Sequence, residues 1–346
     1  MPSAYLNNPS RVLPITVTPD APDRDVVLLK LVGAIVPGWA GCRRAGIMVV
    51  PGGITNQLFR LSATDRPTVL VRVYGRNTEV VIDREAENQL FARLSQEGFA
   101  PTYYGRFENG RVEGWWSGFR PLEPHEMGDP HIRRLIAAKL HEMHGIAPLE
   151  PAPMMWATLN RWMDAALKLT FDGPDAERYA ALELPRYAEV MAALERSFHE
   201  RPLTGPGEAL ADRSVLAHND LLSGNILYDD ANEVRFIDYE YGACAPAGFD
   251  IANHFCEYAG FDSDYERGFP GRDVRDDFIA AYLGRETTAE VVSGFSRAVD
   301  RFILCDHFWW GIWAVIQAKY STIDFDYLEY ARLRLAGFDY HEETLG

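Results

Sequence analysis

The chain has 346 residues, of which 47% are hydrophobic, and this is enough for a sizeable core in one large or two modest domains. Its 34 Lys and Arg residues against 50 Asp and Glu residues give a formal net charge of −16 at pH 7. This acidic balance argues against nucleic acids and anionic membrane surfaces as partners, and it suits a small cationic substrate.

The cysteine pattern and the N-terminal sequence indicate the cellular compartment. The cysteines form no C-x-x-C pair, which predicts free thiols in a reducing environment. Residues 1–25 lack the apolar core of a signal peptide, and the longest apolar segment, residues 26–36, is interrupted by Lys30 and too short to span a bilayer. We therefore expect a cytoplasmic protein without stable membrane insertion. The cysteines are Cys42, Cys244, Cys256 and Cys305.

The first third of the chain is predicted to be rich in strands. Residues 1–22, rich in Pro, Asn and Thr, predict an extended or mobile N-terminal arm, and apolar residues at helical spacing predict a helix over 23–36. A second helix is expected over 83–95, after a short strand over 78–82. The other predicted strands cover residues 47–50, 57–62, 68–74, 102–107 and 112–119, the last two flanking an Asn-Gly turn.

After Pro121 the pattern becomes mainly helical. We therefore predict the α+β class, with an N-terminal lobe over residues 23–119 and a helical C-terminal lobe over 120–346. The predicted helices cover residues 130–144, 158–169, 176–198, 248–257, 272–283, 288–317 and 325–335.

The stretch 215–258 organises the chain. An apolar run leads into the pattern H-x-D-x-x-x-x-N, formed by His218, Asp220 and Asn225. A hairpin of strands 226–228 and 234–237 then delivers Asp238 and Glu240 to the same end of a small sheet. A carboxylate near a hydroxyl, with an amide and a second carboxylate around a hard cation, is what phosphoryl transfer from Mg-ATP requires. The alternative is an ordinary polar hairpin in which Asp and Asn form turns.

Each side chain in this stretch has an expected role. Asp220 is placed to orient or deprotonate an attacking hydroxyl. Asn225 and Asp238 are expected to bind Mg²⁺, and Glu240 is a candidate second carboxylate for the metal. His218 is expected to fix the loop by hydrogen bonds rather than to act in catalysis.

Two features in the first third could contact nucleotide phosphates. The turn over residues 52–56 contains Gly53, Thr55 and Asn56, whose backbone could approach phosphates closely, although an ordinary turn is the alternative. Arg72 ends an otherwise apolar strand and could contact the α- and β-phosphates. Glu87 is its expected partner and Glu85 the runner-up, while a surface ion pair of little energetic value is the alternative.

Two further features could support a substrate site. Asp250 is expected to cap the following helix and to brace the catalytic loop. Trp310 and Trp313 share one face of a strongly aromatic C-terminal helix and could bind an ammonium group, with Glu257 as the compensating carboxylate. A packed helical core is the alternative for these aromatic residues.

Taken together, seven segments resemble the choline/ethanolamine kinases, and the resemblance covers about residues 45–335. It implies a protein-kinase-like two-lobe fold with ATP and Mg²⁺ as cofactors. ATP is then expected between the lobes, with the adenine near residues 119–122. The segments that carry the resemblance are residues 53–56, 70–75, 83–87, 218–225, 237–241, 249–255 and 307–330.

The resemblance also implies roles for individual residues. Asp220 would be the catalytic base, and Asn225 and Asp238 would be the magnesium ligands. Arg72 would stand where protein kinases have a strand lysine and would pair with Glu87. The residues that look like the ammonium site are Glu257, Trp310, Trp313 and Tyr330.

Residues 218–222, 237–242 and 318–330 look most like the ethanolamine kinase branch. We therefore predict a kinase that transfers the ATP γ-phosphate to the hydroxyl of ethanolamine, a small cationic amino alcohol. The alternatives are a choline kinase or a dual kinase, another small-alcohol or aminoglycoside phosphotransferase, and a non-catalytic nucleotide-binding module. Whether the protein forms a homodimer is left open.

Overall fold

The computed structural model describes residues 4–51, 56–75, 82–150, 152–229, 231–321 and 323–345. The chain divides into two compact units, Met1–Phe119 and Arg120–Gly346, and each is described here by itself. Two sequence-based predictions fall outside the described residues: most of the turn over 52–56, with Gly53 and Thr55, and nearly all of the short strand over 78–82.

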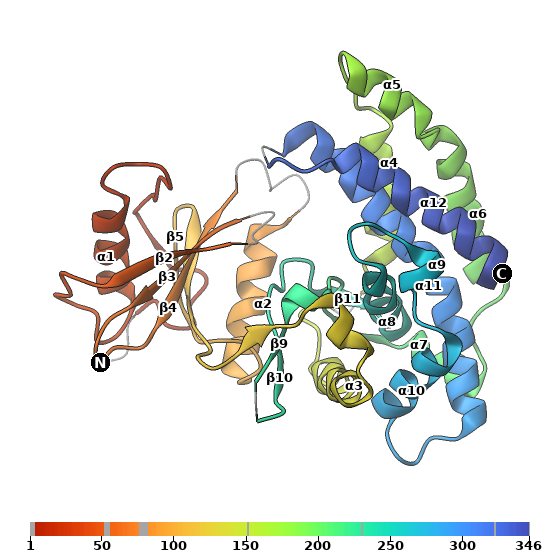
Figure 1. Ribbon diagram of the computed structural model, residues 1–346, viewed down its shortest axis with the longest axis horizontal. Helices are drawn as coiled ribbons and strands as arrows, with labels where there is room; N and C mark the ends of the chain where they lie inside the picture. Colours follow the sequence, from red (N-terminus) through yellow and green to blue (C-terminus); the bar gives the residue numbers. More distant parts are fainter. Residues whose placement is uncertain are drawn as a thin grey trace. The chain divides into compact units, whose positions relative to one another are not determined.

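The first unit contains a six-stranded sheet over the described residues, in the order β1-β5-β6-β4-β3-β2 (Figure 1). The neighbouring strands are antiparallel except for β1 and β5, which are parallel. The strands expected near these positions are confirmed, although β6 begins and ends earlier than expected. The strands are β1 (Val12–Leu13), β2 (Gly46–Val50), β3 (Asn56–Ser62), β4 (Val69–Tyr74), β5 (Tyr103–Phe107) and β6 (Gly110–Gly114).

Two helices belong to this unit, α1 (Arg24–Ile35) and α2 (Arg84–Gln96), and both lie where the sequence predicts them. Apolar residues of α1 pack with alternate residues of the central strands because strand side chains point to opposite faces of a sheet. Helix α2 begins where the Asp83 side chain accepts hydrogen bonds from the backbone N–H groups of Glu85 and Ala86 at 3.0 and 3.1 Å. The core includes Leu28, Leu31, Val32, Ile35, Trp39, Phe59, Leu61, Val71, Phe107 and Val112.

Described residues of the N-terminal arm pack against the sheet of the first unit. Strand β1 pairs with β5 at the edge of the sheet, and Val17 is 1% exposed. The backbone of Val17 also donates to and accepts from the Asn109 side chain, at 3.0 and 2.8 Å. The arm therefore supplies an edge strand of the sheet.

The second unit is mainly helical, with α11 packed against α4, α7, α8, α10 and α12 (Figure 1). Two small sheets accompany the helices, in the orders β10-β9-β7 and β11-β8 over the described residues. The strands are β7 (Arg120–Pro121), β8 (Ser214–Ala217), β9 (Ile226–Tyr228), β10 (Val234–Phe236) and β11 (Ala243–Pro246). The longer helices are α3 (Pro130–His144), α4 (Met155–Ala166), α5 (Pro174–Ala181), α6 (Leu184–Glu200), α8 (Ala247–Cys256), α10 (Arg272–Leu283), α11 (Ala289–Tyr320) and α12 (Tyr327–Leu345). Shorter elements are η2 (Pro124–Gly128), α7 (Pro206–Ala211), η3 (Ser223–Asn225), η4 (Glu257–Ala259) and α9 (Tyr265–Gly268).

One predicted helix is wrong. Residues 176–198 do not form a single helix, because α5 ends before α6 begins and Glu183 between them has φ of +50°. Pro185 lies at the start of α6, where its missing N–H costs nothing, whereas inside a continuous helix it would remove a hydrogen bond and clash with the preceding turn.

Candidate active site

The segment after β8 is held by a buried carboxylate. Asp250, on α8, accepts hydrogen bonds from the backbone N–H groups of His218 and Asn219, both at 2.7 Å, and from the His144 ring at 2.9 Å. Burial disfavours its charged form, but the hydrogen bond and charge of His144 and the nearby His218 hold the pKa of Asp250 below its ordinary value. Asp250 thus braces the segment, as expected. It does not cap α8, because that helix already begins at Ala247.

The residue after Asp220 is also fixed through its backbone. The N–H of Leu221 donates to the Asn253 side chain at 2.8 Å, and its carbonyl oxygen contacts the His254 ring at 2.9 Å. His218 is fully buried and its Nε2 contacts the Ile237 carbonyl oxygen at 2.9 Å, which supports the structural role expected for this ring. Burial lowers the pKa of His218.

The motif brings Asp220 and Asn225 into direct contact. The amide Nδ2 of Asn225 donates to the Asp220 carboxylate at 3.0 Å and to the Asp220 carbonyl oxygen at 2.8 Å. The two flanking residues Asn219 and Asp238 have φ of +62° and +65°, a left-handed conformation that Asn and Asp tolerate better than most residues. Such conformations often occur at functional sites, where the surrounding contacts enforce them.

Four carboxylates influence one another here. Burial raises the pKa of Asp220 well above its ordinary value, and the negative charges of Glu257, Asp238 and Glu240 raise it further. The hydrogen bond from Asn225 acts in the opposite direction. A cation bound beside Asp220 would stabilise its ionised form.

The donor set suits magnesium. The Asn225 amide nitrogen donates to the carbonyl oxygen and the carboxylate of Asp220, so its Oδ1 is the atom that could bind a cation, and the charges of Asp238 and Glu240 act on the same carboxylate. Among the described residues no group of three or more His, Cys, Asp or Glu side chains could hold a metal ion by itself. Mg²⁺ commonly binds through one or two carboxylates together with waters and substrate phosphates, so the residues present fit this ion.

Glu257 forms an ion pair with a buried arginine. Its Oε1 is 3.3 Å from Nη1 of Arg334 on α12, and the same guanidinium nitrogen lies 3.4 Å from the Tyr330 hydroxyl. The second guanidinium nitrogen, Nη2, binds the Asp306 carboxylate on α11. Burial raises the pKa of Glu257 to about 7, Arg334 lowers it and Asp306 raises it. Sequence reasoning missed Arg334 and Asp306.

The aromatic residues form a connected set of rings. Trp310 and Trp313 lie 5.2 Å apart between ring centroids, and Tyr241 lies 5.2 Å from Trp310. The Trp313 Nε1 donates to the Tyr241 hydroxyl at 2.8 Å. Contacts from Trp313 through Tyr327 and Phe325 reach Tyr330. Tyr241 was not among the predicted substrate residues, although it lies inside a segment that carries the resemblance.

In the first unit, Arg72 and Glu87 are buried but are not direct partners. Nη2 of Arg72 lies 3.5 Å from Oε1 of Glu113, whereas Glu87 binds Arg111 directly and Nη1 of Arg84 at 2.7 Å. Burial opposes ionisation of Glu87, but the charges of Arg111, Arg84 and Arg72 lower its pKa to about 2. The expected Arg72–Glu87 pair is therefore replaced by a network in which Arg72 acts on Glu87 through space. The runner-up Glu85 binds Arg106 at 2.6 Å.

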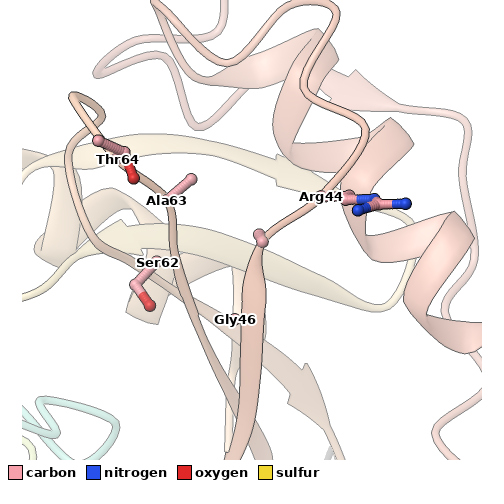
Figure 2. A pocket seen from close by; sticks show the side chains of 6 residues that line it. Arg44, Gly46, Ser62, Ala63 and Thr64 are labelled. Carbon is pink, nitrogen blue, oxygen red and sulfur yellow. The ribbon is translucent and has the colours of Figure 1, made fainter.

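The other predicted phosphate residues are described only in part. Asn56 is buried and its Oδ1 accepts from Nη2 of Arg84 at 3.3 Å, while Gly53 and Thr55 lie outside the described residues. An open hollow elsewhere in this unit, at the end of the β2–β3 ladder, contains none of the predicted site residues (Figure 2). It is lined by Arg44, Ala45, Gly46, Ser62, Ala63 and Thr64.

Comparison with known proteins identifies the family. The family model for choline/ethanolamine kinase matches residues 47–339. The chain belongs to the choline/ethanolamine kinase family. The probable ethanolamine kinase of Arabidopsis thaliana is 39% identical over 296 residues, which are 82% of this chain and 76% of that protein. Ethanolamine kinase 1 of Mus musculus is 34% identical over 322 residues, covering 88% of this chain and 86% of that protein.

A solved structure agrees with this assignment. The structure of a Plasmodium vivax ethanolamine kinase aligns with a TM-score of 0.80 at 25% sequence identity, covering 92% of this chain and 88% of that one. The predicted α+β, protein-kinase-like fold of this kinase family is thereby confirmed. No helix among the described residues is long and apolar enough to be a candidate membrane span.

Proposed function

We propose that this member of the family is an ATP-dependent kinase that phosphorylates the hydroxyl of ethanolamine. The observation that carries the proposal is the buried Asp220–Asn225 contact, together with the neighbouring Glu257 charge that raises the pKa of Asp220. A substrate that carries both a hydroxyl and an ammonium group can satisfy both acids at once. The curated relatives and the solved structure are described as ethanolamine kinases, which supports this substrate.

The residues of the second unit then have distinct tasks. Asp220 accepts a hydrogen bond from the substrate hydroxyl and orients its oxygen for in-line attack on the γ-phosphate. Asn225 keeps the Asp220 carboxylate in place through its amide nitrogen and, with Asp238 and Glu240, would hold Mg²⁺. When bound, this ion supplies positive charge to the phosphate oxygens. The role expected for Arg72, contact with nucleotide phosphates, stays a prediction.

Recognition of the amine would combine an acid with aromatic rings. A primary ammonium group donates three hydrogen bonds and favours a carboxylate such as Glu257. A quaternary ammonium group has no N–H and depends on ring faces such as those of Trp310, Trp313 and Tyr241. Because the site contains both kinds of residue, choline is the alternative substrate that a test must include.

The decisive test is ADP release by the purified protein with Mg-ATP and ethanolamine, choline or kanamycin in parallel. We expect ADP release that depends on ethanolamine and is greatest with it. Equal turnover of choline would indicate a dual kinase, and turnover of kanamycin alone would indicate an aminoglycoside phosphotransferase. Stabilisation by ATP without ADP release from any acceptor would contradict an enzymatic function and indicate a nucleotide-binding module.

Replacement of Trp313 by Phe tests the aromatic part of the amine site. Phe keeps a ring but offers a weaker cation–π contact and loses the hydrogen bond to the Tyr241 hydroxyl. Since a whole cation–π contact contributes about 0.5–2 kcal/mol and Phe keeps part of it, we expect the KM for ethanolamine to rise by at most about 30-fold, with little change in the KM for ATP. Trp156→Phe is the matched control, because Trp156 contacts Phe198 in a different part of the unit. An equal rise in both KM values would contradict the assignment.

A further inference from the structure

The candidate amine site contains a buried cation that the proposed reaction does not use directly. Arg334 is 2% exposed, and its guanidinium group lies between two acids on different helices, Glu257 at the end of α8 and Asp306 on α11. Its Nη2 also donates to the Asp306 carbonyl oxygen at 3.1 Å. Helices α8 and α12 both pack against α11 in the second unit (Figure 1).

These contacts continue to residues 218–225, called the catalytic segment below because they contain the candidate base Asp220. The Asp306 carboxylate accepts from the Asn253 amide nitrogen at 3.2 Å, and the Asn253 amide oxygen accepts from the backbone N–H of Leu221 at 2.8 Å. Leu221 directly follows Asp220. A chain of direct contacts therefore runs from the residue beside the candidate base, through Asn253, Asp306 and Arg334, to Glu257.

The geometry favours an arginine over a lysine at position 334, where one cation contacts both Glu257 and Asp306. A planar guanidinium group has several N–H donors in a fixed fork, so it can bind two carboxylates and a carbonyl oxygen at the same time. A lysine ammonium group is a compact point charge and would not span both acids. Two carboxylates, those of Glu257 and Asp306, bind this one buried cation, which leaves negative charge for a substrate ammonium group to neutralise.

We propose that Arg334 is a positioning residue that fixes the Glu257 carboxylate for the substrate ammonium group, and that Asp306 and Asn253 tie this pair to the segment that carries Asp220. The inference rests on the proposed function, since it concerns how the amine is held during phosphoryl transfer. Arg334 would act through Glu257 and would not touch the reacting atoms. It would couple the position of the amine to that of the hydroxyl-activating carboxylate.

The proposal makes a prediction about pH. The pKa of Glu257 is raised to about 7 by burial, and Arg334 lowers it while Asp306 raises it. Because only the ionised carboxylate attracts an ammonium group, kcat/KM for ethanolamine should rise with pH through about 7 in the native protein. The titratable and charged groups that face Glu257 are Arg334 and Tyr330 on α12, Asp306 on α11, Cys256 on α8, Tyr265 on α9 and Asp220.

Replacing Arg334 and replacing Asp306 should shift the pH profile of kcat/KM in opposite directions. Arg334→Gln removes the charge that lowers the pKa of Glu257, so the acid limb of kcat/KM for ethanolamine should move to higher pH by at least one unit. At pH values on that limb the loss is about tenfold per unit. Asp306→Asn removes a charge that raises the pKa, so the limb should move to lower pH. Glu257→Gln should abolish the part of the limb that belongs to Glu257, leaving only the ionisation of Asp220, and none of the three changes should alter the KM for ATP more than about twofold.

Arg332→Gln is the matched control. Arg332 lies two residues earlier on the same helix, is exposed and pairs with Glu329, so its replacement should leave the profile unchanged. An unchanged limb in a folded Arg334→Gln protein would overturn the proposal, as would persistence of the native limb in Glu257→Gln. If Arg334→Gln does not fold, Asp306→Asn decides alone, and a limb that stays or moves upward refutes the inference. If the native protein turns over no amino alcohol, the proposed function fails instead, which is a different result from native turnover with an unaltered variant profile.

Discussion

Replacement of Asp220 by Asn is expected to lower kcat at least about 100-fold without lowering stability. The amide cannot accept the proton of the attacking hydroxyl, and it can rotate so that its NH₂ group faces that hydroxyl. Stability should be equal or higher, because burial and the charges of Glu257, Asp238 and Glu240 all disfavour the native carboxylate. Single-turnover phosphoryl transfer and the thermal midpoint, measured on the same preparation, would check both statements.

The exposed carboxylate of Asp172, in the same unit, provides the control for this change. Asp172→Asn removes one negative charge from an exposed residue that takes no part in the contacts described above, so its kcat should equal that of the native protein. If Asp220→Asn keeps kcat within tenfold of the native value, Asp220 does not act on the hydroxyl. The role assigned to the motif would then be wrong even though the fold is correct.

Replacement of Asp250 by Asn is expected to be the most destabilising single change at the site. The carboxylate accepts three hydrogen bonds, from the backbone of His218 and Asn219 and from the His144 ring. An amide has only one acceptor oxygen, so its NH₂ group would meet at least one N–H donor in a fully buried place. We expect a loss of about 3–5 kcal/mol in the free energy of unfolding, together with reduced kcat because the backbone before Asp220 is released.

Urea denaturation at pH 7 is the appropriate measurement for this variant. The folded-state pKa of Asp250 lies below its ordinary value, so its contribution is complete above about pH 4 and is lost only as the pH falls further. Asp273→Asn is the control, since Asp273 is exposed and its change should stay within about 0.5 kcal/mol. A midpoint for Asp250→Asn equal to that of the control would contradict the bracing role.

Local patterns predicted the elements that carry the motif. The hairpin of β9 and β10 lies where alternating apolar residues and the intervening turn indicate it, and α3 and α10 have the predicted bounds. The contact between Asp220 and Asn225 joins residues five positions apart, which a motif can encode directly. The break between α5 and α6 was also visible in principle, because Pro185 disfavours a continuous helix.

The partners that fix the site could not be read from the sequence. Asp250 braces residues about thirty positions earlier, and Arg334 reaches Glu257 across 77 positions. Nothing in the local pattern distinguishes Arg334 from the exposed Arg332 beside it, because burial is decided by the packing of α12 on α11. The role of Arg111 could not be predicted from local pattern either. It forms the ion pair with Glu87 that was expected for Arg72, because the pairing of β4 with β6 places Arg111 next to Arg72. Sequence motifs thus predicted the candidate groups, whereas tertiary contacts determine how those groups are charged and held.

The unbroken course of α11 has a consequence for how specificity could change. The helix has 32 residues and, at about 1.5 Å per residue, is roughly 48 Å long, and Asp306, Trp310 and Trp313 all lie within about two of its turns. Their spacing is therefore set by the helix, and a head group bound in the proposed amine site would have to fit that spacing. A bulkier head group would require different side chains on α11 or a different connection between α11 and α12. A continuous helix cannot lengthen the spacing between its residues.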